Sequence, residues 1–160
     1  MDVHVSQFPP RSAYFADRQI EFRQLTQFWQ DRKPRVLAIV GLGGIGKTAL
    51  VGEFIHAITR GHLERPDTVF AWSLYAEPNG TGFLRAACRS LGLDAEHYPA
   101  EALLRILLER LGAAGHSLLV LDGLEWLQHV PTGEQAGSVS DVAVDGRIRH
   151  LVAGIGETQS

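Results

Sequence analysis

Residues 35–48 read RVLAIVGLGGIGKT, an apolar run that ends in a glycine-rich turn. Residues 36–40 show no polar alternation, which is typical of a strand buried on both faces of a parallel sheet. Residues 41–48 fit the pattern G-x-x-x-x-G-K-[ST] of the phosphate-binding loop, or Walker A motif. We therefore expect a buried strand, a phosphate loop and then a helix in this part of the chain.

The residue types of this loop suit phosphate groups. Glycines let backbone N–H groups turn inward around phosphate oxygens, and a helix that starts near Lys47 adds its positive N-terminal end. The Lys47 ammonium can reach the β- and γ-phosphates, and the Thr48 hydroxyl can ligate Mg²⁺. The residues expected to bind phosphate are Gly41, Leu42, Gly43, Gly44, Ile45, Gly46, Lys47 and Thr48.

The same glycines also fit the dinucleotide-binding fingerprint G-x-G-x-x-G. That fingerprint requires an acidic residue about 20 positions further on, at the end of the second strand. Glu64 and Asp67 lie near that distance, but both precede the next expected strand, residues 69–75. The Lys-Thr pair also has no role in the fingerprint, so we reject this interpretation.

A third apolar strand candidate, Ser117–Asp122, ends in a carboxylate. Ligands of open α/β sheets bind at the carboxyl ends of the strands, where a Walker B aspartate orients the Mg²⁺ shell. The alternative for Asp122 is a helix-capping aspartate, but the upstream phosphate loop favours the Walker B role. Glu125 can either polarise an attacking water or lie in a solvated turn, and the sequence leaves both open.

Apolar positions at helical spacing predict one helix before the phosphate loop and three after it. The first follows Asp17, the second ends at Gly61, and the other two end at Gly92 and Gly112. Helices that alternate with buried strands predict an α/β protein with a parallel sheet.

The length and composition restrict the class of protein. A chain of 160 residues suggests one domain, which we place at residues 14–160 after a flexible lead-in over residues 1–13. The net charge of −3 and the pI near 6.1 provide no basic field for nucleic acid. We therefore expect no nucleic-acid partner.

The single cysteine and the absence of a long apolar run indicate in which cellular compartment the protein is expected. Cys88 alone excludes an internal disulfide and a multi-cysteine metal site, and we expect it to be a small buried residue. The N-terminus lacks the apolar core of a signal peptide, and no run approaches 18 apolar residues. These features predict a cytoplasmic protein without a membrane partner.

Three segments resemble the STAND ATPases, the NB-ARC and NACHT group. Residues 41–48 resemble their phosphate loop, and Leu119–Glu125, LVLDGLE, resembles the Walker B segment of bacterial NACHT-type members. Tyr14–Arg18 is similar to the segment that contacts the nucleotide base, which would include Phe15 and Arg18. There the family usually has Gly-Arg-Glu, whereas this chain has Asp-Arg-Gln at residues 17–19.

The resemblance, over roughly residues 14–151, implies a three-layer P-loop NTPase fold that binds ATP or ADP with Mg²⁺. It implies a nucleotide-controlled oligomerisation switch in signal transduction, which acts through self-association or other domains of a larger protein. Thr48 and Asp122 would hold the metal, while Lys47, Asp122 and Glu125 would form the catalytic set.

The family orders its strands 5-1-4-3-2, so a fourth strand would lie between residues 36–40 and residues 117–122. Residues 123–160 contain no convincing candidate, so we expect an incomplete sheet and little ATP turnover. Two alternatives remain: another P-loop NTPase, of AAA type or a kinase, and a non-catalytic fragment that binds nucleotide weakly or packs on a partner.

Overall fold

The structure is a computed structural model, and it describes residues 2–10, 17–31, 36–76, 80–113, 116–124, 150–151 and 153–155. Within these residues the elements along the chain are β1 (Asp2–Gln7), α1 (Gln19–Asp31), α2 (Lys47–Arg60), β2 (Thr68–Ser73), α3 (Gly80–Ser90), α4 (Ala100–Ala113) and β3 (Ser117–Asp122). None of the described helices is both long and apolar enough to cross a membrane.

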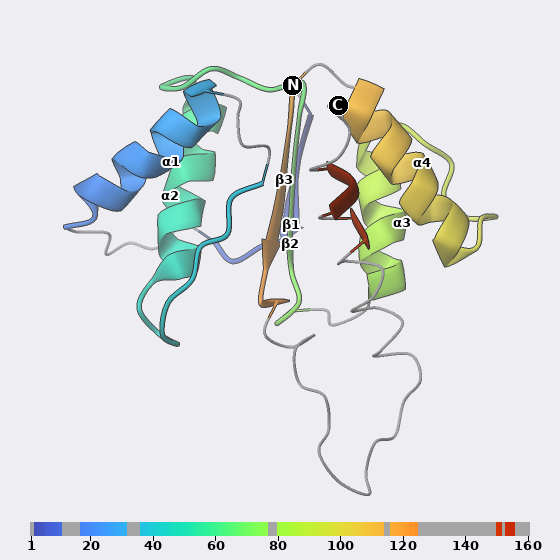
Figure 1. The fold of residues 1–160 in the computed structure, drawn as a ribbon, viewed down its shortest axis with the longest axis horizontal. Coiled ribbons are helices and arrows are strands. Elements are labelled where there is room, and N and C mark those ends of the chain that lie inside the picture. Colours follow the sequence, from blue (N-terminus) through green and yellow to red (C-terminus); the bar gives the residue numbers. More distant parts are fainter. Residues whose placement is uncertain are drawn as a thin grey trace, which may run out of the picture.

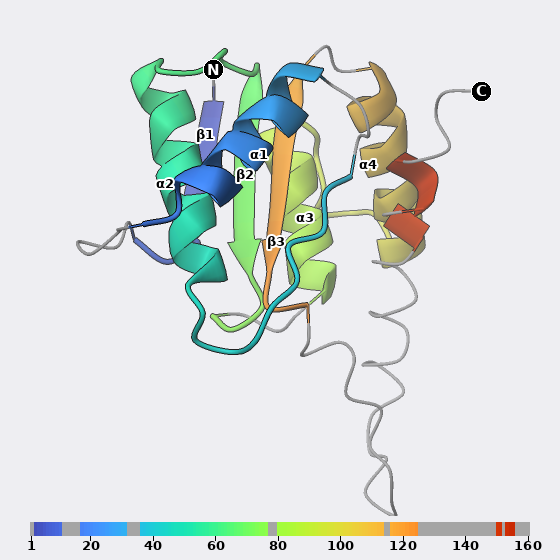
Figure 2. The same ribbon diagram turned by 60° about the vertical axis from the view of Figure 1, so that its left-hand side comes forward.

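The elements form three layers. The strands pair in parallel in the order β1-β2-β3. Helices α1 and α2 cover one face of this sheet, and α3 and α4 cover the other (Figures 1 and 2). The predicted α/β architecture with a parallel sheet is therefore confirmed, and the described residues contribute three strands to that sheet.

The central strand β2 divides the core into two parts because all six of its residues are buried. Successive side chains of a strand point to opposite faces. Val69 and Ala71 accordingly pack in the cluster under α1 and α2, whereas Phe70 and Trp72 pack in the cluster under α3 and α4. The absence of polar alternation in β2 thus results from burial on both faces.

Glycines follow α2 and α3 where the sequence predicts, whereas α4 runs through the expected stop at Gly112 and ends at Ala113. Helix α2 ends at Gly61, whose left-handed φ of 79° suits a residue without Cβ. The N–H of Gly61 donates to Ile58 O, which satisfies one of the last carbonyls of the helix. Gly92 follows α3 with a φ of 73°. Cys88 of α3 is buried as expected, and burial raises the pKa of its thiol.

Residues 2–7 depart from the flexible lead-in expected for residues 1–13. They form β1, which pairs with β2 from Asp2↔Thr68 to Gln7↔Trp72, with an irregularity in register after His4. Val3 and Val5 alternate with polar residues in this segment, and Val5 packs against the cluster under α1 and α2. This short period-2 pattern becomes a strand because the edge of β2 supplies hydrogen-bond partners.

The strand expected at residues 36–40 is not present, and that prediction is wrong. The segment carries no strand hydrogen bonds, and it runs as an extended trace on the β3 side of the sheet (Figures 1 and 2). Ile39 packs against the cluster under α1 and α2, but Leu37 and Val40 are 43% and 89% exposed. The physical reason is the absence of a pairing neighbour: within the described residues, β3 pairs with β2 alone.

This difference between the strands can be measured by amide hydrogen exchange. We expect the amides of residues 68–73 to be the most protected, because β2 is hydrogen-bonded on both edges and buried on both faces. Residues 36–40 should exchange at least about a hundredfold faster, because an opening difference of about 3 kcal/mol corresponds to that factor. Equal protection of the two segments would show that residues 36–40 are paired in solution.

Candidate phosphate-binding site

The site lies at the edge of the sheet where β2 and β3 end. These strands pair in register from Thr68↔Ser117 to Ser73↔Asp122, so that Ser73 and Asp122 end side by side. The turn over residues 41–46 and the first turn of α2 lie at this same end of the sheet (Figure 1). The carboxyl ends of parallel strands are the usual place for ligands in open α/β sheets.

The glycine-rich loop adopts a backbone that only glycine accepts readily. Gly44 and Gly46 have φ values of 75° and 86°, and Gly46 immediately precedes α2. A Cβ built at Gly43 or Gly44 would meet no atom within 4 Å, so this part of the loop faces open space. The loop therefore has room for a ligand beside the positive N-terminal end of a 14-residue helix.

Two cations lie on the carbonyl groups of this loop. Lys47 Nζ donates to Gly41 O at 2.9 Å and to Leu42 O at 3.1 Å. The guanidinium of Arg18 donates to Ile45 O, and it is also the nearest group to a Cβ built at Gly46. In the structure both cations thus donate to carbonyl oxygens of the chain itself. A bound anion would compete with these oxygens for the N–H groups of Lys47 and Arg18.

Arg18 connects this loop to the first helix. Its backbone O accepts the N–H of Phe22, so Arg18 lies at the start of α1. At the other end of α1, Trp29 Nε1 donates to Glu64 O at 2.9 Å, and the Trp29 ring stacks on His116 at 4.0 Å. Helix α1 is therefore held both at the loop and at the opposite end of the sheet.

Two hydroxyl groups contact the carboxylate of Asp122. Thr48 Oγ1 lies 3.0 Å from Asp122 Oδ1 and 3.1 Å from Oδ2, although the two residues are 74 positions apart in the chain. Ser73 Oγ donates to Asp122 Oδ2 at 3.4 Å. These contacts favour the Walker B interpretation of Asp122 over helix capping, because the carboxylate binds groups of the phosphate loop and of the neighbouring strand.

The donor set fits a magnesium ion. Mg²⁺ prefers hard oxygen ligands and is usually held by one or two protein groups together with phosphates and waters. The Thr48 hydroxyl and the Asp122 carboxylate supply such oxygens beside a loop that has room for phosphate. Thr48 and Asp122 would therefore hold the ion, which would neutralise phosphate charge.

The structure assembles most of the site residues expected from the sequence. It brings together the loop at residues 41–48, Asp122 and Arg18. Phe15 and Glu125 lie outside the described residues. Sequence reasoning missed Ser73, because its only signal was a serine within an expected strand, and the pairing register is what places it beside Asp122.

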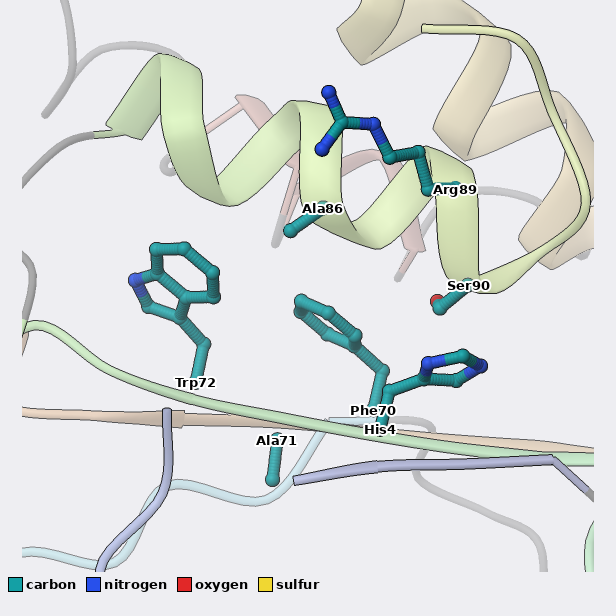
Figure 3. A pocket seen from close by; sticks show the side chains of 7 residues that line it. All are labelled: His4, Phe70, Ala71, Trp72, Ala86, Arg89 and Ser90. Carbon is teal, nitrogen blue, oxygen red and sulfur yellow. The ribbon is translucent and has the colours of Figure 1, made fainter. Parts of the chain in front are cut away.

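A hollow of about 210 Å³ lies elsewhere, on the side of the sheet covered by α3. It is lined by His4, Phe70, Ala71, Trp72, Ala86, Arg89 and Ser90. The rings of Phe70 and Trp72 point from the sheet toward α3, whereas the guanidinium of Arg89 points away from the hollow (Figure 3). Arg89 forms an ion pair with Glu96 instead. No residue of the phosphate loop lines this hollow, so we do not assign the site to it.

Residues 14–133 match the family described as the AAA ATPase domain. The chain belongs to the AAA ATPase domain family. The match covers both the phosphate loop and Asp122, but begins after β1. No curated protein and no solved structure matches the chain significantly. Membership of this family, together with the geometry at residues 41–48, identifies a P-loop NTPase domain whose family binds nucleotide.

The contact between Arg18 and the loop leads to a prediction about nucleotide affinity. Arg18→Ala should weaken ADP binding by about 1.5–3 kcal/mol, the contribution of a hydrogen bond to a charged group. Arg18→Lys should recover part of this loss, because lysine keeps the charge but not the planar fork. Isothermal calorimetry measures both variants, with Arg23→Ala as the control on the same helix. An affinity in Arg18→Ala equal to that of the wild type would remove Arg18 from the site.

Proposed function

We propose that this chain is the Mg²⁺-dependent ATP- and ADP-binding module of a nucleotide-controlled switch. The observation that carries the proposal is the contact between Thr48 and Asp122, which joins the phosphate loop to the end of β3. Supporting it are the open glycine loop and the AAA ATPase domain match over residues 14–133. The switch role is suggested by the resemblance of residues 41–48 and 119–125 to STAND ATPases.

The loop residues would bind phosphate in place of their present contacts. Gly44 and Gly46, with positive φ, allow successive backbone N–H groups to face one anion. Lys47 would exchange the carbonyl oxygens of Gly41 and Leu42 for phosphate oxygens, which carry more negative charge. The helix dipole of α2 acts in the same direction, since its positive end faces the loop.

The metal and base contacts would come from the remaining site residues. Thr48 and Asp122 would hold Mg²⁺ through their oxygens, and Phe15 and Arg18 would contact the nucleotide from the segment before α1. Lys47 and Asp122 would also serve hydrolysis, with Glu125 as the residue that orients a water. These roles follow the family resemblance, and the geometry of Thr48, Asp122 and Lys47 supports theirs.

The role of Lys47 can be tested by removing its ammonium group. Lys47→Ala should weaken binding of Mg²⁺–ADP by about 1.5–3 kcal/mol, which is about 10- to 150-fold in Kd. Arg60→Ala is the matched control, because it removes a cation at the far end of the same helix. Calorimetry in which the two variants bind equally well would contradict the assignment of the phosphate loop.

A switch and a steadily cycling NTPase differ in their response to nucleotide. For the switch, we expect a larger molecular mass with Mg²⁺–ATP than with Mg²⁺–ADP, and turnover slow enough for the ATP form to persist. Analytical ultracentrifugation with each nucleotide, alongside phosphate release measured on the same sample, provides the two readouts. Lys47→Ala is the control, because it should remove both the mass difference and the phosphate release.

The results separate the proposal from the alternative. Rapid, sustained phosphate release with the same mass in both nucleotides would favour another AAA-type NTPase, which fits the family match equally well. Binding of nucleotide without turnover or a change of mass would favour a binding fragment. A kinase would need transfer to an acceptor, which appears as ATP consumption without release of free phosphate.

A further inference from the structure

A buried serine lies beside Asp122 at the edge of the sheet. Ser73 is the last residue of β2, and its side chain is fully buried. It pairs in register with Asp122 on β3, and its hydroxyl lies 3.4 Å from Asp122 Oδ2. We propose that Ser73 is a positioning residue that orients the Asp122 carboxylate for the Mg²⁺ of the bound nucleotide. This inference rests on the proposed function.

Ser73 is a polar residue at the end of an otherwise apolar, buried part of β2. The four residues before it, 69–72, are apolar and pack in the core, and Leu74 after it is also fully buried. A buried hydroxyl costs free energy unless it forms a hydrogen bond. Ser90, another buried serine, donates to Ala87 O of its own helix, whereas Ser73 donates to a carboxylate on the neighbouring strand. The hydroxyl of Ser73 therefore donates to Asp122 rather than to a carbonyl group of its own strand.

Ser73 and Thr48 hold the carboxylate from different parts of the structure. Thr48 belongs to the phosphate loop and is itself an expected metal ligand, so its hydroxyl would donate to Asp122 while its oxygen coordinates the ion. Ser73 belongs to the central strand and lies outside the loop. Its contact with Oδ2 at 3.4 Å would therefore orient the carboxylate independently of the loop. Loss of this bond should thus affect the contribution of Mg²⁺ more than the binding of phosphate by the loop.

The test compares ADP affinity in Mg²⁺ with ADP affinity in EDTA for each variant. Asp122→Asn is the reference, because it should remove most of the difference between the two conditions. Ser73→Ala should reduce the Mg²⁺-dependent gain in affinity about three- to tenfold, the effect of one net hydrogen bond, and change the affinity in EDTA less than about twofold. Ser73→Thr keeps the hydroxyl and should restore most of the gain.

The matched control is Ser90→Ala, which removes a buried serine hydroxyl that has no contact with Asp122. It should leave the Mg²⁺-dependent gain unchanged. If Ser73→Ala does not fold in a thermal melt, Ser73→Cys replaces it, because a thiol is similar in size but a weak donor. The gain should then be reduced as for alanine.

The outcomes separate this inference from the proposed function. A wild-type protein that binds ADP equally in Mg²⁺ and in EDTA overturns the proposed metal site. A wild type that depends on Mg²⁺, with Asp122→Asn impaired and the Ser73 variant unchanged, overturns the role of Ser73 alone. Equal losses in Mg²⁺ and in EDTA for the Ser73 variant would show that Ser73 only stabilises the fold, and would also overturn the inference.

Discussion

The parallel pairing of β2 with β3 is the constraint on which the site depends. The two strands pair without a shift over six residues, so their last residues, Ser73 and Asp122, end at the same level. Burial on both faces holds β2 in place between two hydrophobic clusters. A slip of β2 by one residue would turn Phe70 and Trp72 toward the opposite cluster and would move the Ser73 hydroxyl away from Asp122. The packing of the core therefore decides which polar side chains meet at the carboxyl ends of β2 and β3.

The two edges of the sheet differ in how they are covered. Strand β1 extends the β2 side, and it lies before the segment that matches the AAA ATPase domain family. On the other side, the residues of β3 are only half-buried, and the extended segment 36–40 is close by but unpaired. Val40 and Leu42 lie at its end with most of their surface exposed. In a P-loop sheet with the strand order that the family resemblance implies, a further strand would lie between β3 and residues 36–40. That strand would cover both segments.

The phosphate loop has a conformation in which its cations are satisfied internally. Lys47 and Arg18 both donate to loop carbonyl groups, which offsets the cost of bringing two positive charges close to a helix N-terminus. An incoming anion has to displace these contacts, but it provides more negative charge than a carbonyl oxygen. Because Arg18 lies at the start of α1, its contact with Ile45 O joins the loop to that helix.

The sequence by itself determined the features that depend on local chemistry. The phosphate loop, the ends of α2 and α3 at Gly61 and Gly92, and the bounds of β3 at residues 117–122 were all predicted, because glycine conformation and apolar runs are local properties. The Walker B interpretation of Asp122 followed from its place at the end of an apolar strand together with the upstream phosphate loop, and the contact with Thr48 supports it.

Only the tertiary structure decided which extended segments became strands and which side chains met. Residues 36–40 have the stronger apolar run but no hydrogen-bond partner, whereas residues 2–7 have a weaker pattern and the open edge of β2. The contacts of Ser73 with Asp122 and of Arg18 with Ile45 likewise join residues 49 and 27 positions apart. A segment becomes a strand only when a neighbouring strand supplies hydrogen-bond partners for its backbone, and the register between strands decides which side chains meet. Neither property can therefore be predicted from one segment alone.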